Sequence, residues 1–451
     1  MSGRAAAGTT PALGGALSGG APSGTEAITG VATGACSVSE VASECLEKVQ
    51  ELDGSIGAFR IIDENIVRSA AKELDDQIPG LLQGLIVGVK DVIDTADLPT
   101  RYGSPLFEGH QPSADAAVVT ALRQAGALVL GKTESTEFAM FQPTRTRNPA
   151  DPGRTPGGSS SGSAAAVAAG MVPVALGTQT AGSVIRPAAY CGVYGFKPSK
   201  GWAPTDGIWL LSRQLDTVGL FARSAADLAV LYRALRRPAT RRPQAEDRPR
   251  SDRAQRSVLI LNAGEWASCE PEVGDALDFT ASRLSDSGWN VQEIRMPDAW
   301  RHLPDQHIVV MAVEVAQNLH AALGHRLGQI SESAQAIVEQ GDRCRARDYL
   351  TALEAREEAR ALLSPLSVAG DLLLLPSALG VAPEGLAYTG DPVMCRPWTL
   401  LGLPAANIPG YRRQDGLPVG VQLVGLAGHD LSFLADLESA EAAITRRRSD
   451  S

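Results

Sequence analysis

Short runs of apolar residues, repeated along most of the chain, constrain its fold more than any other feature. They alternate with stretches rich in Ala and Leu that have helical spacing, and they occur at residues 85–89, 127–130, 172–176, 258–261, 372–375 and 419–424. A short, continuous apolar run is typical of a strand that is buried on both faces of a sheet. The alternation of such strands with helices predicts an α/β fold, with a large mixed β-sheet core flanked by helices on both sides.

The composition is that of an ordinary folded protein, and it excludes several classes. Hydrophobic residues make up 44% of the 451 residues and charged residues 20%, so wholesale disorder, collagen and coiled coil are excluded. The net charge of −10 provides no field that attracts a phosphate backbone, so nucleic acid is not expected as a partner. No apolar run approaches the roughly 18 residues that span a bilayer, so no membrane partner is expected.

The cysteines and the N-terminus indicate the compartment. The 6 cysteines are scattered along the chain without a C-x-x-C pair, which is usual for reduced thiols. After Arg4 come Gly, Ala, Ser and Thr in place of the continuous apolar stretch of a signal peptide. We therefore expect a cytoplasmic protein.

Two segments of unusual composition set the expected domain organisation. Residues 1–34 form a tract of Gly, Ala, Ser, Thr and Pro with little apolar surface to bury, which predicts a disordered tail. A helix is expected to begin at Ser37, because Glu40 completes a capping box. Residues 35–451 then form a single domain. Within it, the segment 236–256 is interpreted as a polar linker or insertion and not as a basic docking patch.

Two stretches match motifs of other enzyme classes, but their surroundings do not fit. Residues 126–133 satisfy the P-loop pattern G-x-x-x-x-G-K-T, yet the variable positions Ala-Leu-Val-Leu form an apolar strand whose amides are needed by neighbouring strands. Residues 158–162 satisfy the nucleophile-elbow pattern G-x-S-x-G, with His429 as an available base. That elbow requires a strand directly before it, and the prolines within residues 149–156 argue against an inner strand there.

The histidines indicate neither a metal site nor a catalyst, which directs attention to lysine. The pairs His302/His307 and His320/His325 are five residues apart, about 140° around a helix, so neither pair shares one face as zinc ligands do. Each lone histidine is interpreted as a surface or helix-end residue. Lys90 ends an apolar run, where desolvation favours a neutral amine able to accept a proton, although such a lysine more often extends to solvent.

Two loops of small residues offer the remaining parts of a catalytic site. Residues 154–170 are a Gly- and Ser-rich loop that leads into a short Ala-rich helix, a composition shared with flexible linkers. Residues 177–188 follow the apolar run at 172–176, and their small side chains let successive backbone N–H groups converge on one point. Such a turn can form an oxyanion hole.

Several motifs together resemble the amidase signature family, and they occur in the family's order. They cover nearly the whole chain except the N-terminal tract and the middle segment, so the resemblance implies that residues 35–451 are one amidase signature domain with the amidase signature fold. The motifs are Leu85-Ile-Val-Gly-Val-Lys90-Asp, Gly131-Lys-Thr-Glu-Ser-Thr-Glu-Phe-Ala-Met140, Arg147-Asn-Pro149, Pro156-Gly-Gly-Ser-Ser160, Gly177-Thr-Gln-Thr-Ala-Gly-Ser183, Gly195-Phe-Lys-Pro198, Leu215-Asp-Thr-Val-Gly219, Gly402-Leu-Pro-Ala405 and Gly416-Leu-Pro-Val-Gly-Val-Gln-Leu-Val-Gly425.

The resemblance implies a Ser-Ser-Lys triad, with Ser183 as nucleophile, Ser159 as the bridging serine after a cis peptide bond, and Lys90 as base. In this arrangement neutral Lys90 accepts the proton of Ser159, which accepts that of Ser183 as it attacks an amide carbonyl. The resemblance also implies an oxyanion hole, formed by the N–H groups of Thr180, Ala181, Gly182 and Ser183. It implies no cofactor and no metal.

Two departures from the common family pattern bear on the substrate. Gln179 and Ala181 stand where common members have Asp and Gly, and Arg186 lies three residues after the nucleophile instead of two. These changes favour a subgroup outside the glutaminyl-tRNA amidotransferase A subunits. Arg186 has the fork geometry that binds a substrate carboxylate, and it could equally hold neighbouring backbone carbonyls.

The sequence therefore predicts an amidase that hydrolyses carbon–nitrogen bonds of linear amides through a covalent acyl-enzyme on Ser183, releasing an amine or ammonia and a carboxylic acid. Its expected partner is a small-molecule amide, and a homodimer is possible. The alternative is an A-type component of a glutamine-dependent tRNA amidotransferase, which the acidic charge disfavours. A third hypothesis, a catalytically inactive binding scaffold, is disfavoured because all three triad positions are filled.

Overall fold

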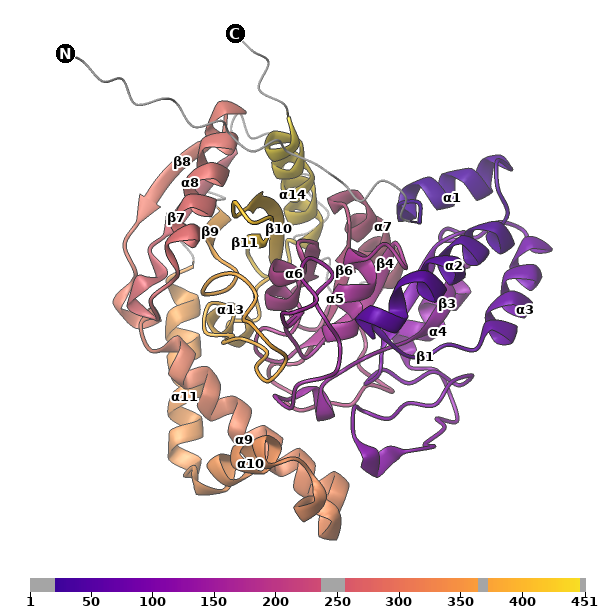
Figure 1. The fold of residues 1–451 in the computed structure, drawn as a ribbon. Helices are drawn as coiled ribbons and strands as arrows, with labels where there is room; N and C mark the ends of the chain where they lie inside the picture. The colour runs from indigo at the N-terminus through magenta and orange to yellow at the C-terminus, as the bar shows by residue number, and fades with distance from the viewer. Residues whose placement is uncertain (1–20, 237–255, 364–371, 447–451) are drawn as a thin grey trace.

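The computed structural model describes residues 21–236, 256–363 and 372–446, and it confirms the predicted α/β fold (Figure 1). In these residues the strands form one mixed, 11-stranded sheet in the order β1-β3-β2-β4-β6-β5-β10-β11-β9-β7-β8. The strands are β1 (Phe59–Ile61), β2 (Ile86–Lys90), β3 (Leu128–Thr133), β4 (Val174–Gln179), β5 (Tyr194–Lys197), β6 (Thr217–Ala222), β7 (Ser257–Leu261), β8 (Asn290–Ile294), β9 (Leu372–Pro376), β10 (Ala405–Arg412) and β11 (Pro418–Val424). The helices are α1 (Gly24–Thr33), α2 (Val38–Ile56), α3 (Glu64–Asp75), α4 (Ala117–Gln124), α5 (Ser161–Ala168), α6 (Ile185–Cys191), α7 (Ala225–Leu235), α8 (Pro271–Asp286), α9 (Leu303–Leu323), α10 (Glu332–Arg343), α11 (Ala346–Ala361), α13 (Arg396–Leu400) and α14 (Asp430–Thr445).

The sheet contains both parallel and antiparallel pairs. β2 lies between β3 and β4 and is parallel to both, and β7 is parallel to β8 and β9. The pairs that lead from β4 across the middle of the sheet to β9 are antiparallel. The six apolar runs of the sequence correspond to β2, β3, β4, β7, β9 and β11. β3 includes residues 128–133 of the stretch 126–133 that matches the P-loop pattern, so most of this stretch is a strand, as predicted.

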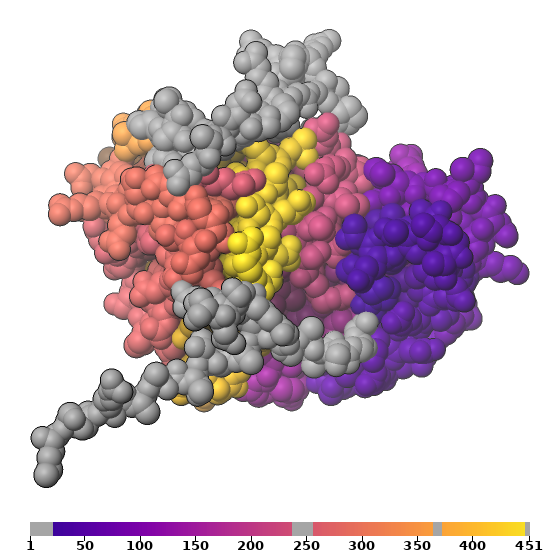
Figure 2. All heavy atoms as spheres, turned by 90° about the horizontal axis from the view of Figure 1, so that it is seen from above, coloured from indigo at the N-terminus to yellow at the C-terminus, as the bar shows by residue number. Residues whose placement is uncertain are grey.

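Helices cover both faces of the sheet, as predicted. Along β2, Val87 and Val89 belong to a core shared with α4 and α7, while Ile86 belongs to a second core shared with α2 and α5. α14 packs between α7 and α8 (Figure 2). The helices α9, α10 and α11 lie together at one end of the molecule and extend away from the sheet (Figure 1). None of the described helices has the length and hydropathy of a membrane span.

α5 lies close against the sheet because its residues are small. Its first seven residues are buried, and all but one of its eight are Ser, Gly or Ala. At Gly162 an added Cβ would lie 2.1 Å from the carbonyl oxygen of Ala58, a distance that no side chain tolerates. The close approach of α5 places the loop before it directly at the end of β2.

Part of the segment that we predicted to be a disordered tail is helical, because residues 24–33 form α1. α1 begins with a capping box formed by Ser23 and Glu26, and Ala27 is buried. The composition did not reveal this helix, because its attachment rests on hydrogen bonds and on close packing of small residues in place of large apolar side chains. Residues 1–20 and 237–255, and with them most of the expected linker, lie outside the described residues.

A buried carboxylate on α7 fixes the start of α1. The backbone N–H groups of Gly24 and Thr25 donate to the Asp227 carboxylate at 3.1 and 2.8 Å. Helix N-termini leave such N–H groups without intrahelical partners, and a carboxylate also complements the positive end of the helix dipole. The next helix, α2, begins with the predicted capping box of Ser37 and Glu40.

Replacing Asp227 with Ala should detach α1 and lower the free energy of unfolding by about 1 to 3 kcal/mol, because buried N–H groups lose their acceptor. Chemical denaturation measures the change, and limited proteolysis should cut first within residues 21–34. Asp278→Ala, at an exposed position of α8, is the control and should change neither result. Equal stability of the two variants would contradict the role given to Asp227.

Candidate active site

Lys90 is the last residue of β2, and its side chain is fully buried. Its Nζ lies 2.7 Å from Oγ of Ser159 and 2.8 Å from Oγ1 of Thr178. Both partners are neutral hydroxyls, so neither stabilises an ammonium as a carboxylate would. Burial lowers the pKa of Lys90 from its ordinary value of 10.5 to about 7, although the Asp216 carboxylate opposes this shift. Lys90 therefore supplies a neutral amine near neutral pH.

Ser159 lies in the loop that leads into α5, and the peptide bond between Gly158 and Ser159 is cis. The carbonyl of Ser159 accepts the N–H of Thr136 at 3.2 Å. The loop comes directly before α5 with no strand preceding it, so residues 158–162 do not form the elbow that their pattern suggests.

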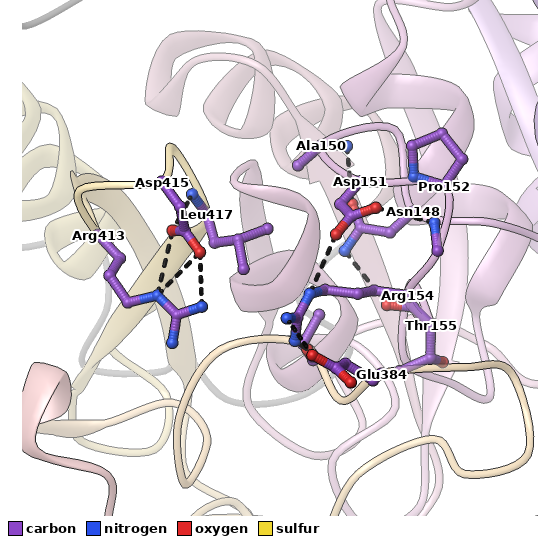
Figure 3. Close-up of polar contacts among 12 residues, drawn as sticks. Asn148, Ala150, Asp151, Pro152, Arg154, Thr155, Glu384, Arg413, Asp415 and Leu417 are labelled. Atoms are coloured by element: carbon purple, nitrogen blue, oxygen red, sulfur yellow. Dashed lines mark hydrogen bonds and ion pairs between the residues drawn. The ribbon is translucent and has the colours of Figure 1, made fainter.

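Polar contacts hold the chain before Ser159 in place (Figure 3). Arg154 donates to the Asp151 carboxylate at 3.1 Å, to the Ala382 carbonyl at 2.7 Å and to Glu384 at 2.9 Å. The amide of Asn148 donates to the carbonyl of Thr155 at 3.2 Å. These contacts tie the loop to a segment more than 200 residues away in sequence. They hold the part of the loop that precedes Ser159.

Ser183 lies in the turn between β4 and α6, and Gln179 organises that turn. The Gln179 Oε1 atom accepts the N–H groups of Val184 at 2.8 Å and Ile185 at 3.1 Å, which caps the start of α6. Its Nε2 donates to Oγ1 of Thr399 at 3.0 Å. The amide of Gln179 thus supplies both an acceptor and a donor to the turn, whereas an ionised Asp at this position could only accept.

Two further contacts shape the same turn. Oγ1 of Thr180 donates to the buried carboxylate of Asp216 at 2.5 Å, and that carboxylate also accepts the N–H groups of Leu211 and Ser212. At Gly182 an added Cβ would lie 2.8 Å from Cβ of Pro392, so the turn packs against the segment around Pro392 too closely for a side chain. The turn is therefore held by hydrogen bonds and by this close packing.

The structure brings most of the predicted site residues together. Lys90 contacts Ser159 directly, and no Ser159–Ser183 hydrogen bond is among those of the described residues, so that link stays a prediction. One pocket is lined by Ser183 and the other predicted residues Thr180, Ala181 and Arg186, together with Ala139, Met140, Phe141, Leu211, Met311, Val315, Ile337 and Pro392.

Arg186 is buried at the base of this pocket, with 2% of its surface exposed. Its Nη2 donates to the carbonyl of Gly158 at 2.7 Å and to Oγ1 of Thr389 at 3.4 Å. Its Nε and Nη1 are buried without a hydrogen-bond partner in the described part of the chain. Arg186 therefore holds a backbone carbonyl beside Ser159 and keeps two donors free.

Four residues around the site had no role in our sequence prediction: Thr178, Asp216, His307 and Thr399. Thr178 and Asp216 lie within the family motifs, so their positions in these motifs could have identified them as site residues. His307 was interpreted as a surface or helix-end residue, and that interpretation is wrong. It is fully buried in α9, because α9 packs over the turn that contains Ser183. Within the described ranges, no cluster of His, Cys, Asp and Glu is suited to hold a metal ion.

Comparison with known proteins identifies the family of this chain. The sequence profile of the amidase family matches residues 40–434. This chain is a member of the amidase signature family. It is 36% identical to the A subunit of the glutamyl-tRNA(Gln) amidotransferase of Thermus thermophilus, over 92% of this chain and 96% of that protein.

Solved structures of the family agree with the fold. A crystal structure of an amidase is 30% identical, with a TM-score of 0.83, over 94% of this chain and 100% of that chain. The 6-aminohexanoate cyclic dimer hydrolase, solved with its substrate, is 25% identical, with a TM-score of 0.82, over 95% of this chain and 98% of that chain. The predicted family and fold class are confirmed.

If neutral Lys90 is the base, kcat/KM should rise with pH through about 7 as the amine loses its proton. Lys90→Met should abolish turnover. Between pH 7 and 10.5 the folded chain binds fewer protons at Lys90 than the unfolded chain does. Lys90 therefore lowers the free energy of unfolding most below pH 7, and this destabilisation disappears as the pH rises to 10.5. At neutral pH, Lys90→Met should therefore melt no lower than the parent.

Lys197 provides a matched control, because burial lowers its pKa to about 7 as well. Its Nζ donates to the backbone carbonyls of Pro198 and Leu403, away from the site. Lys197→Met leaves these two carbonyls without their donor, so it should lose stability despite removing a buried amine, and it should keep the rising limb of the pH profile. A limb that survives Lys90→Met, or that disappears with Lys197→Met, would refute the assignment of the base.

Proposed function

We propose that this family member hydrolyses linear amides through a covalent acyl-enzyme on Ser183. The contact between the buried amine of Lys90 and Ser159 carries the proposal, because it supplies a base without histidine. The pocket that contains Ser183 and the turn from Thr180 supports it. Placement in the cytoplasm and association as a homodimer are further expectations of the proposal.

In the proposed reaction, neutral Lys90 accepts the proton of Ser159 while Ser159 accepts that of Ser183. Oγ of Ser183 attacks the amide carbon, and the N–H groups of residues 180–183 donate to the oxyanion, each contributing about 3 kcal/mol. The relay then returns the proton to the leaving nitrogen, and the C–N bond breaks. Water attacks the resulting ester with the same base, which releases the carboxylic acid and restores Ser183.

We propose that the acyl part of the substrate carries a carboxylate. Nε and Nη1 of buried Arg186 have no hydrogen-bond partner among the described residues, so each can donate to a carboxylate, and the other pocket walls are largely apolar. The residues that line the pocket include no Asp or Glu to pair with the ammonium group of an amino acid. These features favour a small amide acid that lacks an α-amino group.

The second candidate is an A-type component that hydrolyses glutamine within a tRNA amidotransferase complex. The names of the similar curated proteins favour it, since the relatives from Thermus thermophilus, Cyanothece and Anaeromyxobacter are all glutamyl-tRNA(Gln) amidotransferase A subunits. The pocket lining favours the amidase. Turnover of glutamine only in the presence of copurifying partner proteins would establish the second candidate, whereas turnover of amide acids by the isolated chain would establish the first.

Ser183→Ala should lower amide hydrolysis by more than about 1,000-fold and abolish covalent labelling by a fluorophosphonate, because the attacking oxygen is removed. The melting temperature should stay unchanged. Ser104→Ala is the control: Ser104 is also buried, but it donates to Glu137 and does not line the pocket. Labelling of Ser183→Ala would place the nucleophile elsewhere.

Arg186→Met should lower kcat/KM about 10- to 100-fold for an amide acid and much less for the methyl ester of the same substrate. Comparing the two substrates separates carboxylate binding from the contact between Arg186 and the Gly158 carbonyl, since loss of that contact affects both substrates equally. Arg186→Lys, which keeps the charge, should recover part of the preference. Equal losses for acid and ester would show that Arg186 only supports the loop.

A further inference from the structure

His307 makes a single polar contact that reaches the catalytic turn. Its Nε2 lies 2.8 Å from the carbonyl oxygen of Thr180. A carbonyl oxygen only accepts hydrogen bonds, so Nε2 carries the proton and donates it, and Nδ1 is the unprotonated nitrogen. Nδ1 is buried without a partner in the described part of the chain. Burial lowers the pKa of His307 to about 3, so it is a neutral donor.

Because the peptide bond is planar, this contact also orients an N–H group. In a trans peptide the C=O and N–H groups lie in one plane and point in opposite directions. The bond between Gly158 and Ser159 is the cis bond of the described residues, so the peptides of the Ser183 turn are trans. The Thr180 carbonyl shares its peptide with the N–H of Ala181. Holding the oxygen on one side therefore directs that N–H to the other.

Thr399 on α13 holds the next peptide in the same way. Its Oγ1 lies 2.8 Å from the carbonyl oxygen of Ala181 and 3.1 Å from that of Cys395, so its one hydrogen is donated to the nearer Ala181 carbonyl, and Oγ1 accepts the Nε2–H of Gln179. The Ala181 carbonyl shares its peptide with the N–H of Gly182. Two successive carbonyls of the turn are thus each held by a buried side chain from the C-terminal half of the chain.

We propose that His307 and Thr399 are positioning residues of the oxyanion hole. They hold the carbonyls of Thr180 and Ala181 away from the substrate, so that the N–H groups of Ala181 and Gly182 face the developing negative charge. This inference rests on the proposed acyl-enzyme reaction. It assigns to His307 of α9 and Thr399 of α13 a part in the stabilisation of the transition state.

The test compares His307→Met, which removes the donor, with His307→Gln, whose Nε2 can donate to the Thr180 carbonyl. In His307→Met, kcat should fall about 10- to 100-fold while KM stays within about 2-fold, because the oxyanion forms only after substrate has bound. His307→Gln should recover most of kcat. Affinity for an aldehyde analogue of the substrate, which Ser183 converts into a tetrahedral adduct, should fall in parallel with kcat/KM.

Two further variants separate positioning from folding. Val310→Ala opens a cavity at a buried position of α9 and should lower the melting temperature while kcat stays within about 2-fold. Thr399→Val removes the other donor, the Thr399 hydroxyl, with little change in shape. It should reproduce the kcat loss even if His307→Met does not fold.

Unchanged kcat in Thr399→Val, or no recovery by a folded His307→Gln, would overturn the positioning role. Activity of Ser183→Ala would instead overturn the acyl-enzyme proposal on which that role rests.

Discussion

The site depends on an amine buried among groups that do not favour its charge. Lys90 is fully buried at the end of β2, and its contacts are the hydroxyls of Ser159 and Thr178. The sheet produces this environment, because β2 lies between two parallel strands and both of its faces are covered by helices. The pairing of Val89 with Leu176 sets the ends of β2 and β4 at one edge of the sheet, so Lys90 and the turn after β4 meet there. A change that admits water to this edge should raise the pKa of Lys90 and so protonate the proposed base.

Asp216 shows how closely charge is balanced around this amine. Its carboxylate opposes the lowering of the Lys90 pKa, yet it also binds Thr180 and two backbone N–H groups. Burial raises the pKa of Asp216 itself. The same carboxylate therefore stabilises the turn and limits how far the lysine pKa can fall, which keeps the pKa of the base near neutrality.

The sequence predicted the strands that consist mainly of buried apolar residues. Buried strands such as β9, and β2 before Lys90, consist of apolar residues, so they could be recognised. β8 (Asn290–Ile294) has a mixed pattern and partly exposed residues, and β1 has three residues, so neither gave a signal. Lys90 was predicted from the resemblance to the family, because a lysine at a strand end more often extends to solvent and its position alone did not identify it. His307 and Thr399 could not be, because they act on backbone carbonyls, which any donor in reach can bind regardless of motif.

The supports of the catalytic turn come from far along the chain. Lys90, Ser159 and Ser183 all lie before residue 184, whereas His307 and Thr399 belong to α9 and α13. Synthesis proceeds from the N-terminus, so a growing chain contains the proposed catalytic serines and lysine well before α9 and α13 can dock. In our proposal, a chain that lacks α9 and α13 also lacks the side chains that would orient the N–H groups of the oxyanion hole. Full activity would therefore require the C-terminal half of the chain to have folded onto the turn.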